Sequence, residues 1–250
     1  LADLIALHGF VVCRDNAMID ITGDAGLLGK GGEVMAQIAC ALPSRKNLPA
    51  EILLDALPAG ELLSVPAQVN YVGLGMNLKP TGYAYSGAHA VVMRHLRMGY
   101  LWDRVRVQGG AYGCTAHYNR STGSMVFVSY RDPNVLATLN VYRGAARYLA
   151  DLRLSEADIT RAVVGAIGDV DHYLLPGAKG AAGFGQWLSG ESDEDRQRRR
   201  EEMLGTTLLD FHAFAPYLER ALEGALPCVL GGSDAEAVAE AEGWTKTSVL

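Results

Sequence analysis

The fold is decided by the stretch Tyr100-Leu-Trp-Asp-Arg-Val-Arg106-Val-Gln-Gly-Gly-Ala-Tyr112-Gly113, which joins an apolar helical pattern to a glycine-rich turn and then to a strand. Arginine has a permanent charge and a planar fork of donors, and tyrosine has one hydroxyl on a stiff ring, so Arg106 and Tyr112 on a pre-organised turn can hold a polarised carbonyl. Neither side chain can cleave a bond unaided. A plainer interpretation stays open, in which Arg106 pairs with a surface carboxylate, Tyr112 packs in the core and the glycines only turn the chain.

The segments around this stretch predict an α+β order. Apolar residues at helical spacing predict a helix over residues 83–103 that delivers the chain to Arg106. Alternating residues then predict a hairpin of strands 111–119 and 124–130, and Asp132-Pro-Asn134 begins another helix. Further strands are expected at residues 17–22, 65–74 and 227–230, and further helices at residues 1–12 and 29–41. Three more helices are expected to begin near capping-box pairs, which are Ser155 with Asp158, Ser192 with Asp195, and Ser233 with Glu236.

Together these elements predict one mostly antiparallel sheet packed against helices on one side. No repeat or low-complexity linker divides the sequence, so residues 1–250 are expected to form a single domain, with a mixed connector over residues 43–66. The chain is 49% hydrophobic and 20% charged, and a domain of this size hides roughly 70–75% of its unfolded surface. A substantial core is therefore expected. The first residue is Leu rather than Met, which suggests a trimmed piece of a longer protein.

The charge balance argues against nucleic acid as a partner. The net charge is −6, whereas phosphate binding needs a clustered basic surface. The dense basic run at residues 196–200 is bracketed by acids, and Glu194 with Arg198 and Asp195 with Arg199 are spaced four apart, which indicates a solvated helix face. The apolar segment at residues 1–12 is too short to span a bilayer and indicates a core helix, so no membrane partner is expected.

Motifs for other chemistries fail on their spacing. The glycines at residues 23–32 follow a predicted strand, but they match neither the dinucleotide fingerprint nor a Walker loop. Four scattered cysteines indicate buried free thiols rather than a disulfide scaffold or a zinc knuckle. His89 and His95 are six apart, which places them on different helix faces, and no His-x-x-Glu-His occurs. All six histidines are therefore interpreted as structural, and no metal site is predicted in this chain.

Several strings in one order resemble the last domain of the presequence proteases, which are large zinc peptidases of the pitrilysin type, also called inverzincins. The resemblance runs from about Ala17 to the C-terminus. It is carried by Leu101-Trp-Asp-Arg-Val-Arg-Val-Gln-Gly-Gly-Ala-Tyr-Gly113, Val128-Ser-Tyr-Arg-Asp-Pro-Asn134, Ile167-Gly-Asp-Val-Asp171, Leu175-Pro-Gly-Ala-Lys-Gly180, Asp195-Arg-Gln-Arg-Arg-Arg-Glu-Glu202 and Asp210-Phe-His-Ala-Phe214.

The resemblance implies a specific role for this chain. In these metalloendopeptidases four similar domains form one protein, and the first carries the His-x-x-Glu-His motif that binds zinc and activates water. Because the motif is absent here, the resemblance implies a non-catalytic domain whose sheet closes over a peptide substrate, with zinc and the partner N-terminal lobe supplied elsewhere in the protein. Arg106 and Tyr112 match the Arg that binds the substrate main chain and the Tyr that donates to the oxyanion.

The resemblance also implies substrates that are short unstructured peptides and targeting presequences. It implies a mitochondrial or plastid compartment in a eukaryote and the cytoplasm in a bacterium.

Two alternatives stay open: an architectural subunit that never closes on a substrate, and, ranked last, an independent cysteine or serine hydrolase. Cleavage by this chain alone would favour the hydrolase, whereas activity that returns only with the N-terminal portion would favour the peptidase domain.

Overall fold

The computed structural model describes residues 1–44 and 56–249, so residues 45–55 of the connector expected at residues 43–66 lie outside the described residues. The chain divides into two compact units. One comprises residues 1–55 and 172–192, and the other comprises residues 56–171 and 193–250. Each unit is described by itself, and the expectation of a single domain over residues 1–250 stays a prediction.

The first unit is helical. It contains α1 (Ala2–Val11), the 3₁₀ helix η1 (Arg14–Asn16), α2 (Ala25–Ala41) and α7 (Pro176–Leu188). The strand predicted at residues 17–22 is wrong, because these residues pair with no strand in the described part of the chain. The helix predicted from Gly29 starts earlier because the Asp24 carboxylate caps it, accepting from the Leu27 N–H at 2.8 Å. The helix expected at residues 1–12 forms, but Leu4 and Ile5 are exposed rather than in a core.

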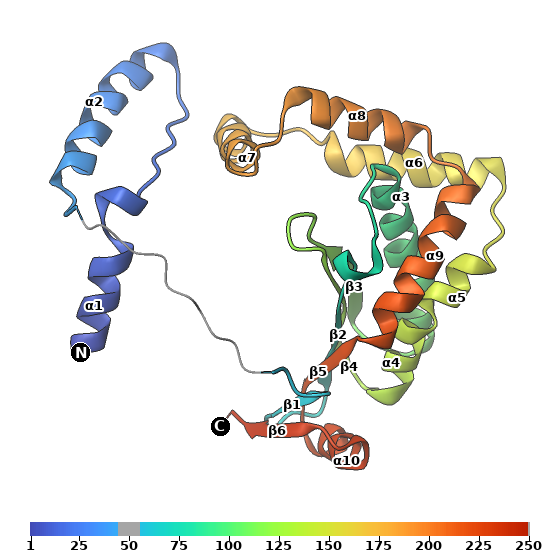
Figure 1. The fold of residues 1–250 in the computed structure, drawn as a ribbon. Coiled ribbons are helices and arrows are strands. Elements are labelled where there is room, and N and C mark those ends of the chain that lie inside the picture. The colour runs from blue at the N-terminus through green and yellow to red at the C-terminus, as the bar shows by residue number, and fades with distance from the viewer. Residues whose placement is uncertain (45–55, 250) are drawn as a thin grey trace. The chain divides into compact units, whose positions relative to one another are not determined.

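The second unit contains the sheet, which Figure 1 shows with its covering helices. Six strands among the described residues lie in the order β3-β4-β2-β5-β1-β6. The pairs β3–β4, β4–β2 and β2–β5 are antiparallel, and β5–β1 and β1–β6 are parallel. The mostly antiparallel sheet is therefore confirmed. The strands are β1 (Glu61–Ser64), β2 (Asn70–Asn77), β3 (Gly113–Tyr118), β4 (Ser124–Asp132), β5 (Leu226–Gly231) and β6 (Thr245–Ser248).

The two faces of this sheet differ. Along β2, Val72, Leu74 and Met76 are buried, whereas Tyr71 on the opposite face is 44% exposed. The alternation continues on β4, where Phe127 is fully buried. Helices thus cover one face, as predicted, and the other face, called here the open face, presents tyrosines and small side chains.

Helices of the second unit pack on the covered face. Their core side chains include Leu96, Leu101, Leu139 and Phe211, all fully buried. The helices are α3 (Ala88–His95), the π-helix η3 (Leu96–Gln108), α4 (Leu136–Arg143), α5 (Ala145–Ala150), α6 (Glu156–Val170), α8 (Asp193–Leu204), α9 (Leu208–Glu223) and α10 (Ser233–Glu242), with the short 3₁₀ helix η2 (Lys79–Thr81) after β2. No helix in residues 1–44 or 56–249 is both long and apolar enough to cross a membrane.

Several predicted boundaries need correction. The helix predicted at residues 83–103 begins at Ala88 and continues in π-helical form to Gln108, and the strand predicted at residues 65–74 begins at Asn70. The capping box of Ser155 with Asp158 is confirmed. Ser233 does not cap α10, because the Glu236 carboxylate accepts instead from the Ser64 hydroxyl and pairs with Lys246.

The basic run of α8 lies on a solvated face, as predicted. The predicted ion pairs are four residues apart, and two pairs three residues apart are present, Arg196 with Asp193 and Arg198 with Asp195. Both spacings join neighbouring turns of a helix, so the interpretation of the run is unchanged.

Candidate functional site

The turn between η3 and β3 is closed by backbone hydrogen bonds. The Gly110 N–H donates to the Arg106 carbonyl at 3.0 Å, and the Ala111 N–H donates to the Val105 carbonyl at 3.1 Å. Gly110 has φ +81°, a left-handed conformation that favours glycine. A Cβ on Gly109 would lie 2.6 Å from the Val105 carbonyl oxygen. The Gly-Gly pair is therefore needed for this tight reversal at the end of the π-helix.

Arg106 is held by two contacts. Its Nε donates to the Tyr112 carbonyl at 2.9 Å, and its guanidinium carbon lies 4.0 Å from the centre of the Trp102 ring. The side chain is half-buried and has no acidic partner among the described residues. The plainer interpretation of Arg106 as a surface ion pair is therefore not what the structure shows. Its terminal amino groups keep donors for another acceptor.

Tyr112 lies on the open face of the sheet. Its side chain is 65% exposed, so the plainer interpretation of a core tyrosine is wrong. The ring packs edge-on against Tyr130 with centroids 5.3 Å apart, and the Arg131 guanidinium carbon lies 5.8 Å from the ring centre. Tyr130 in turn packs against Tyr71 at 5.4 Å. The Arg106 side chain therefore lies against the Tyr112 backbone, and the Tyr112 phenol is exposed.

The end of β4 anchors this turn. The Asn134 side-chain amide donates to the Gly109 carbonyl at 2.6 Å. Asp132 is fully buried, and its carboxylate accepts from the Asn134 N–H at 2.9 Å and from the Thr138 hydroxyl at 2.8 Å. The Asn70 amide donates to the Asp132 carbonyl at 3.1 Å. The string Asp132-Pro-Asn134 therefore links the Gly-Gly turn to the sheet and to α4.

Cys114 and Cys228 lack the setting of a catalytic thiolate. No disulfide joins the described cysteines, and the prediction of buried thiols is wrong for Cys40 and Cys228, which are exposed. Burial, reinforced by Asp132, raises the pKa of the Cys114 thiol to about 11 despite the nearby Arg106 charge. Burial also raises the pKa of Cys228. Both thiols are therefore protonated at neutral pH, which counts against a cysteine hydrolase.

Three histidines serve structural contacts. His89 Nδ1 and the Tyr83 hydroxyl form a hydrogen bond at 2.9 Å, and burial lowers the pKa of His89 to about 3. His95 Nε2 and the Tyr148 hydroxyl form another at 2.8 Å, and burial lowers its pKa as well. His212 contacts the Leu152 carbonyl at 2.9 Å. No cluster of metal-ligating groups occurs in the part of the chain that the structure describes.

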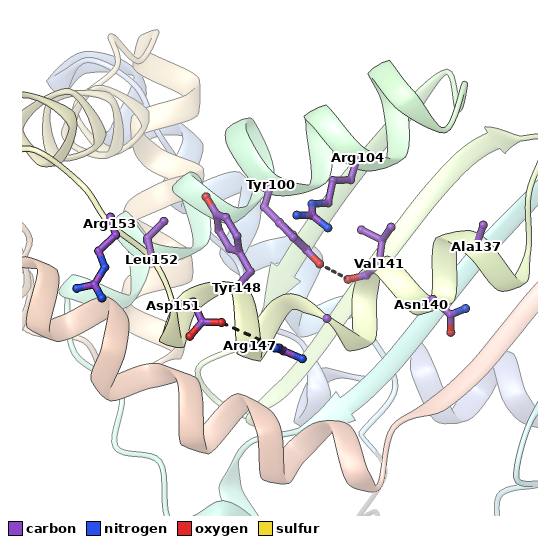
Figure 2. Close-up of a pocket in the computed structure, with 11 residues that line it drawn as sticks. Tyr100, Arg104, Ala137, Asn140, Val141, Arg147, Tyr148, Asp151, Leu152 and Arg153 are labelled. Carbon is purple, nitrogen blue, oxygen red and sulfur yellow. Dashed lines mark hydrogen bonds and ion pairs between the residues drawn. The ribbon is translucent and has the colours of Figure 1, made fainter.

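A cavity of about 600 Å³, separate from Arg106 and Tyr112, lies between η3 and the α4–α5 helices (Figure 2). Tyr100 donates to the Val141 carbonyl at 2.7 Å, and Arg147 pairs with Asp151 at 3.6 Å. Arg104 lies over the Tyr100 ring at 4.9 Å. Neither Arg106 nor Tyr112 lines the cavity, so it is not part of the candidate site.

Sequence reasoning missed two neighbours of Tyr112. Tyr130 and Arg131 both contact its ring. The only sequence signal for Tyr130 and Arg131 was that they belong to the string Val128-Ser-Tyr-Arg-Asp-Pro-Asn134, which resembles the family. The alternation of the strand does not reveal which of the two side chains faces the site.

Known proteins match both the sequence and the fold. The family model described as the PreP C-terminal domain matches residues 60–226. The chain is 39% identical over 210 residues to "Presequence protease 1, chloroplastic/mitochondrial" of Arabidopsis thaliana, covering 84% of this chain and 19% of that protein. It is 30% identical over 222 residues to "Presequence protease, mitochondrial" of Saccharomyces cerevisiae, covering 85% and 22% respectively. The chain thus spans about a fifth of the length of these relatives.

A solved structure, the "peptidase M16 inactive domain" from Pseudomonas fluorescens, has a similar fold. It matches with a TM-score of 0.60 at 15% identity and covers 93% of this chain and 58% of its own. At this identity the likeness shows the fold alone, and it agrees with the mixed sheet and one-sided helical layer described above.

Proposed function

The chain belongs to the PreP C-terminal domain family of presequence protease-like M16 peptidases, and from this premise we propose that it supplies Arg106 and Tyr112 to the active site of a zinc metalloendopeptidase. In this proposal the Arg106 guanidinium binds the substrate main chain beside the scissile bond. The Tyr112 hydroxyl donates to the oxyanion that forms on the carbonyl. Both contacts are made when this domain closes on the N-terminal lobe.

The observation that supports the proposal is that the Arg106 side chain bonds to the Tyr112 backbone while the Tyr112 phenol stays exposed. Arg106 Nε donates to the Tyr112 carbonyl, so the guanidinium lies against the residue that precedes β3. The exposed Tyr112 hydroxyl and the remaining Arg106 donors can then address two positions on one extended peptide. A fixed set of donors stabilises developing charge better than mobile ones, because it needs no reorganisation during the reaction.

We propose that zinc is bound by another domain of the full-length protein. No group of three or more His, Cys, Asp or Glu side chains that could hold a metal occurs among the described residues. His89 and His95 bond to tyrosine hydroxyls, and His212 bonds to a backbone carbonyl. Substrates are proposed to be short unstructured peptides, including presequences. The compartment is proposed to be a mitochondrion or plastid in a eukaryote and the cytoplasm in a bacterium.

An architectural domain is the second candidate function. It is favoured by the fold match to a domain described as inactive, since that fold can exist without catalysis. Against it stands the Gly109-Gly110 reversal, which holds Arg106 against Tyr112 instead of burying either one. A domain used only for assembly has no need of that arrangement.

The test is reconstitution. The purified chain is mixed with the N-terminal remainder of the full-length protein, and cleavage of a short unstructured fluorogenic peptide is followed. The proposal predicts no cleavage by either part alone and cleavage by the mixture. If the N-terminal part alone cleaves the peptide at the full rate, the architectural function is correct, and if this chain alone cleaves it, the chain is an independent hydrolase.

A further inference from the structure

A β-bulge lies beside Tyr112. Asn70 of β2 pairs with Asp132 of β4, and Val72 pairs with Ser129, so two residues of β4 stand opposite Tyr71 alone. The extra residue shifts the alternation of β4 at this point. The Tyr112 N–H donates to both bulged residues, to the Tyr130 carbonyl at 3.1 Å and to the Arg131 carbonyl at 3.3 Å.

Arg131 occupies an unusual backbone conformation within this bulge. Its φ is +50°, and it is the only non-glycine residue of the described chain with positive φ. Such a conformation costs about 1–2 kcal/mol for an ordinary side chain. The Asn70 contact with the Asp132 carbonyl and the buried Asp132 carboxylate hold the next residue in place. Because neighbouring contacts maintain this strained conformation, the direction of the Arg131 side chain is a candidate functional feature.

The bulge directs the Arg131 side chain to the open face. Regular alternation would send Arg131 to the covered face, because Phe127 and Ser129 point there. Instead Arg131 is exposed, and its guanidinium carbon lies 5.8 Å from the centre of the Tyr112 ring. Within residues 1–44 and 56–249 it has no acidic partner. Arg106 and Arg131 thus both approach Tyr112 with uncompensated charge.

We propose that Arg131 is a specificity-determining residue, which binds a carboxylate of the peptide substrate next to the scissile bond. The inference rests on the proposed function, since it takes Tyr112 to mark the scissile carbonyl. The Arg131 guanidinium carbon lies 5.8 Å from the centre of the Tyr112 ring, so a substrate group that Arg131 binds belongs to a residue near the carbonyl that Tyr112 contacts.

The planar fork of a guanidinium matches a carboxylate with two parallel hydrogen bonds. The carboxylate can belong to an acidic side chain or to the C-terminus of a short peptide. Because Arg131 is exposed, solvent screens the interaction, and the expected preference is about twofold to fivefold in kcat/KM rather than the larger factor of a buried pair.

The experiment uses the full-length peptidase and a set of short fluorogenic peptides with one cleavage site. A single Glu is moved through the three positions on either side of the scissile bond, and each peptide is paired with its Gln counterpart. A second pair ends in a free carboxylate or an amide one or two residues after the bond. Each pair is assayed with the native enzyme, with Arg131→Asn and with Arg131→Lys.

Asparagine tolerates the left-handed conformation, so Arg131→Asn keeps the bulge while removing the charge. The native enzyme is expected to prefer the carboxylate about twofold to fivefold, either at one side-chain position or at the C-terminus. Arg131→Asn should abolish that preference, and Arg131→Lys should keep part of it. The ratio within a pair is insensitive to the fraction of enzyme that is folded.

Equal cleavage of every pair by the native enzyme, or a preference that survives Arg131→Asn, would overturn the inference. Tyr112→Phe on the same peptides tests the proposed function separately. If that function holds, this variant is slow on both members of a pair and keeps their ratio. Normal rates with Tyr112→Phe would refute the role of Tyr112 even where the Arg131 preference is found.

Discussion

Acidification should weaken the fold through His89, which is 3% exposed. Its Nδ1 bonds to the Tyr83 hydroxyl, its Nε2 is buried without a partner among the described residues, and its ring packs against Tyr118 and Phe214. Burial lowers its pKa from 6.5 to about 3, so the unfolded chain binds a proton between these values that the folded chain does not. This contribution to stability is complete above pH 6.5 and is lost as the pH falls toward 3.

The size of the effect follows from linkage. Each pH unit in this window costs about 1.4 kcal/mol, so lowering the pH from about 7.5 to about 5 should remove about 2 kcal/mol through His89 alone. Urea unfolding of the chain at the two pH values measures the difference in the free energy of unfolding. His95, whose pKa is also lowered, adds to the total in the same direction.

Substitutions isolate the contribution of His89. His89→Gln keeps a polar group near Tyr83 but does not titrate, so it should lose about 2 kcal/mol of the pH-dependent difference. His8→Gln, at an exposed position, is the matched control. An identical pH dependence in the native chain and in His89→Gln would refute the reasoning.

Three further substitutions test the site and its support. Arg106→Lys loses the donor fork and the Nε contact to the Tyr112 carbonyl, so kcat of the full-length enzyme should fall by about tenfold or more, and an unchanged kcat would exclude bidentate binding. Gly109→Ala places a Cβ against backbone oxygens, which should lower the free energy of unfolding by about 1–3 kcal/mol. The control Gly113→Ala, with open space around it, should be nearly neutral in thermal unfolding. Equal effects of the two substitutions would show that the turn is not tightly packed. Asp132→Ala leaves the Asn134 N–H and the Thr138 hydroxyl without their acceptor and should lower the free energy of unfolding by about 3 kcal/mol. The control Thr138→Val should lower it by about 1 kcal/mol. A smaller loss in Asp132→Ala than in the control would contradict the anchoring role.

The hairpin was predictable from sequence because its signals are local. The strands β3 and β4 alternate clearly, and Gly123 between them adopts φ +75° as a hairpin turn requires. The α6 helix begins where Ser155 and Asp158 form the predicted capping box. In each case the residues that determine the element lie within a few positions of one another.

Elements that depend on distant partners were not predictable. The strands β1 and β6 are four residues each and become strands through parallel pairing with each other and with β5. Conversely, residues 17–22 have a strand-like composition but no described strand beside them. Pairing across the sheet, rather than local propensity, decides these cases.

The same distinction applies to the site. Arg106 and Tyr112 were identified because they flank a local turn within a stretch that resembles a known family, and in the structure the Arg106 side chain bonds to the Tyr112 backbone. Arg131 was missed because its direction depends on a bulge against β2, a strand more than fifty residues earlier in the chain. The sequence of β4 does not reveal this register shift, because it depends on pairing with a distant strand.

The central claim is tested most directly by kcat of the full-length enzyme carrying Tyr112→Phe, with zinc content measured in the same preparation. Tyr173→Phe, which removes an exposed hydroxyl elsewhere, is the matched control. The account predicts that Tyr112→Phe lowers kcat by about 10²–10³ with zinc unchanged, the usual cost of losing one oxyanion donor, while Tyr173→Phe has no effect. A kcat near that of the native enzyme in Tyr112→Phe would contradict it.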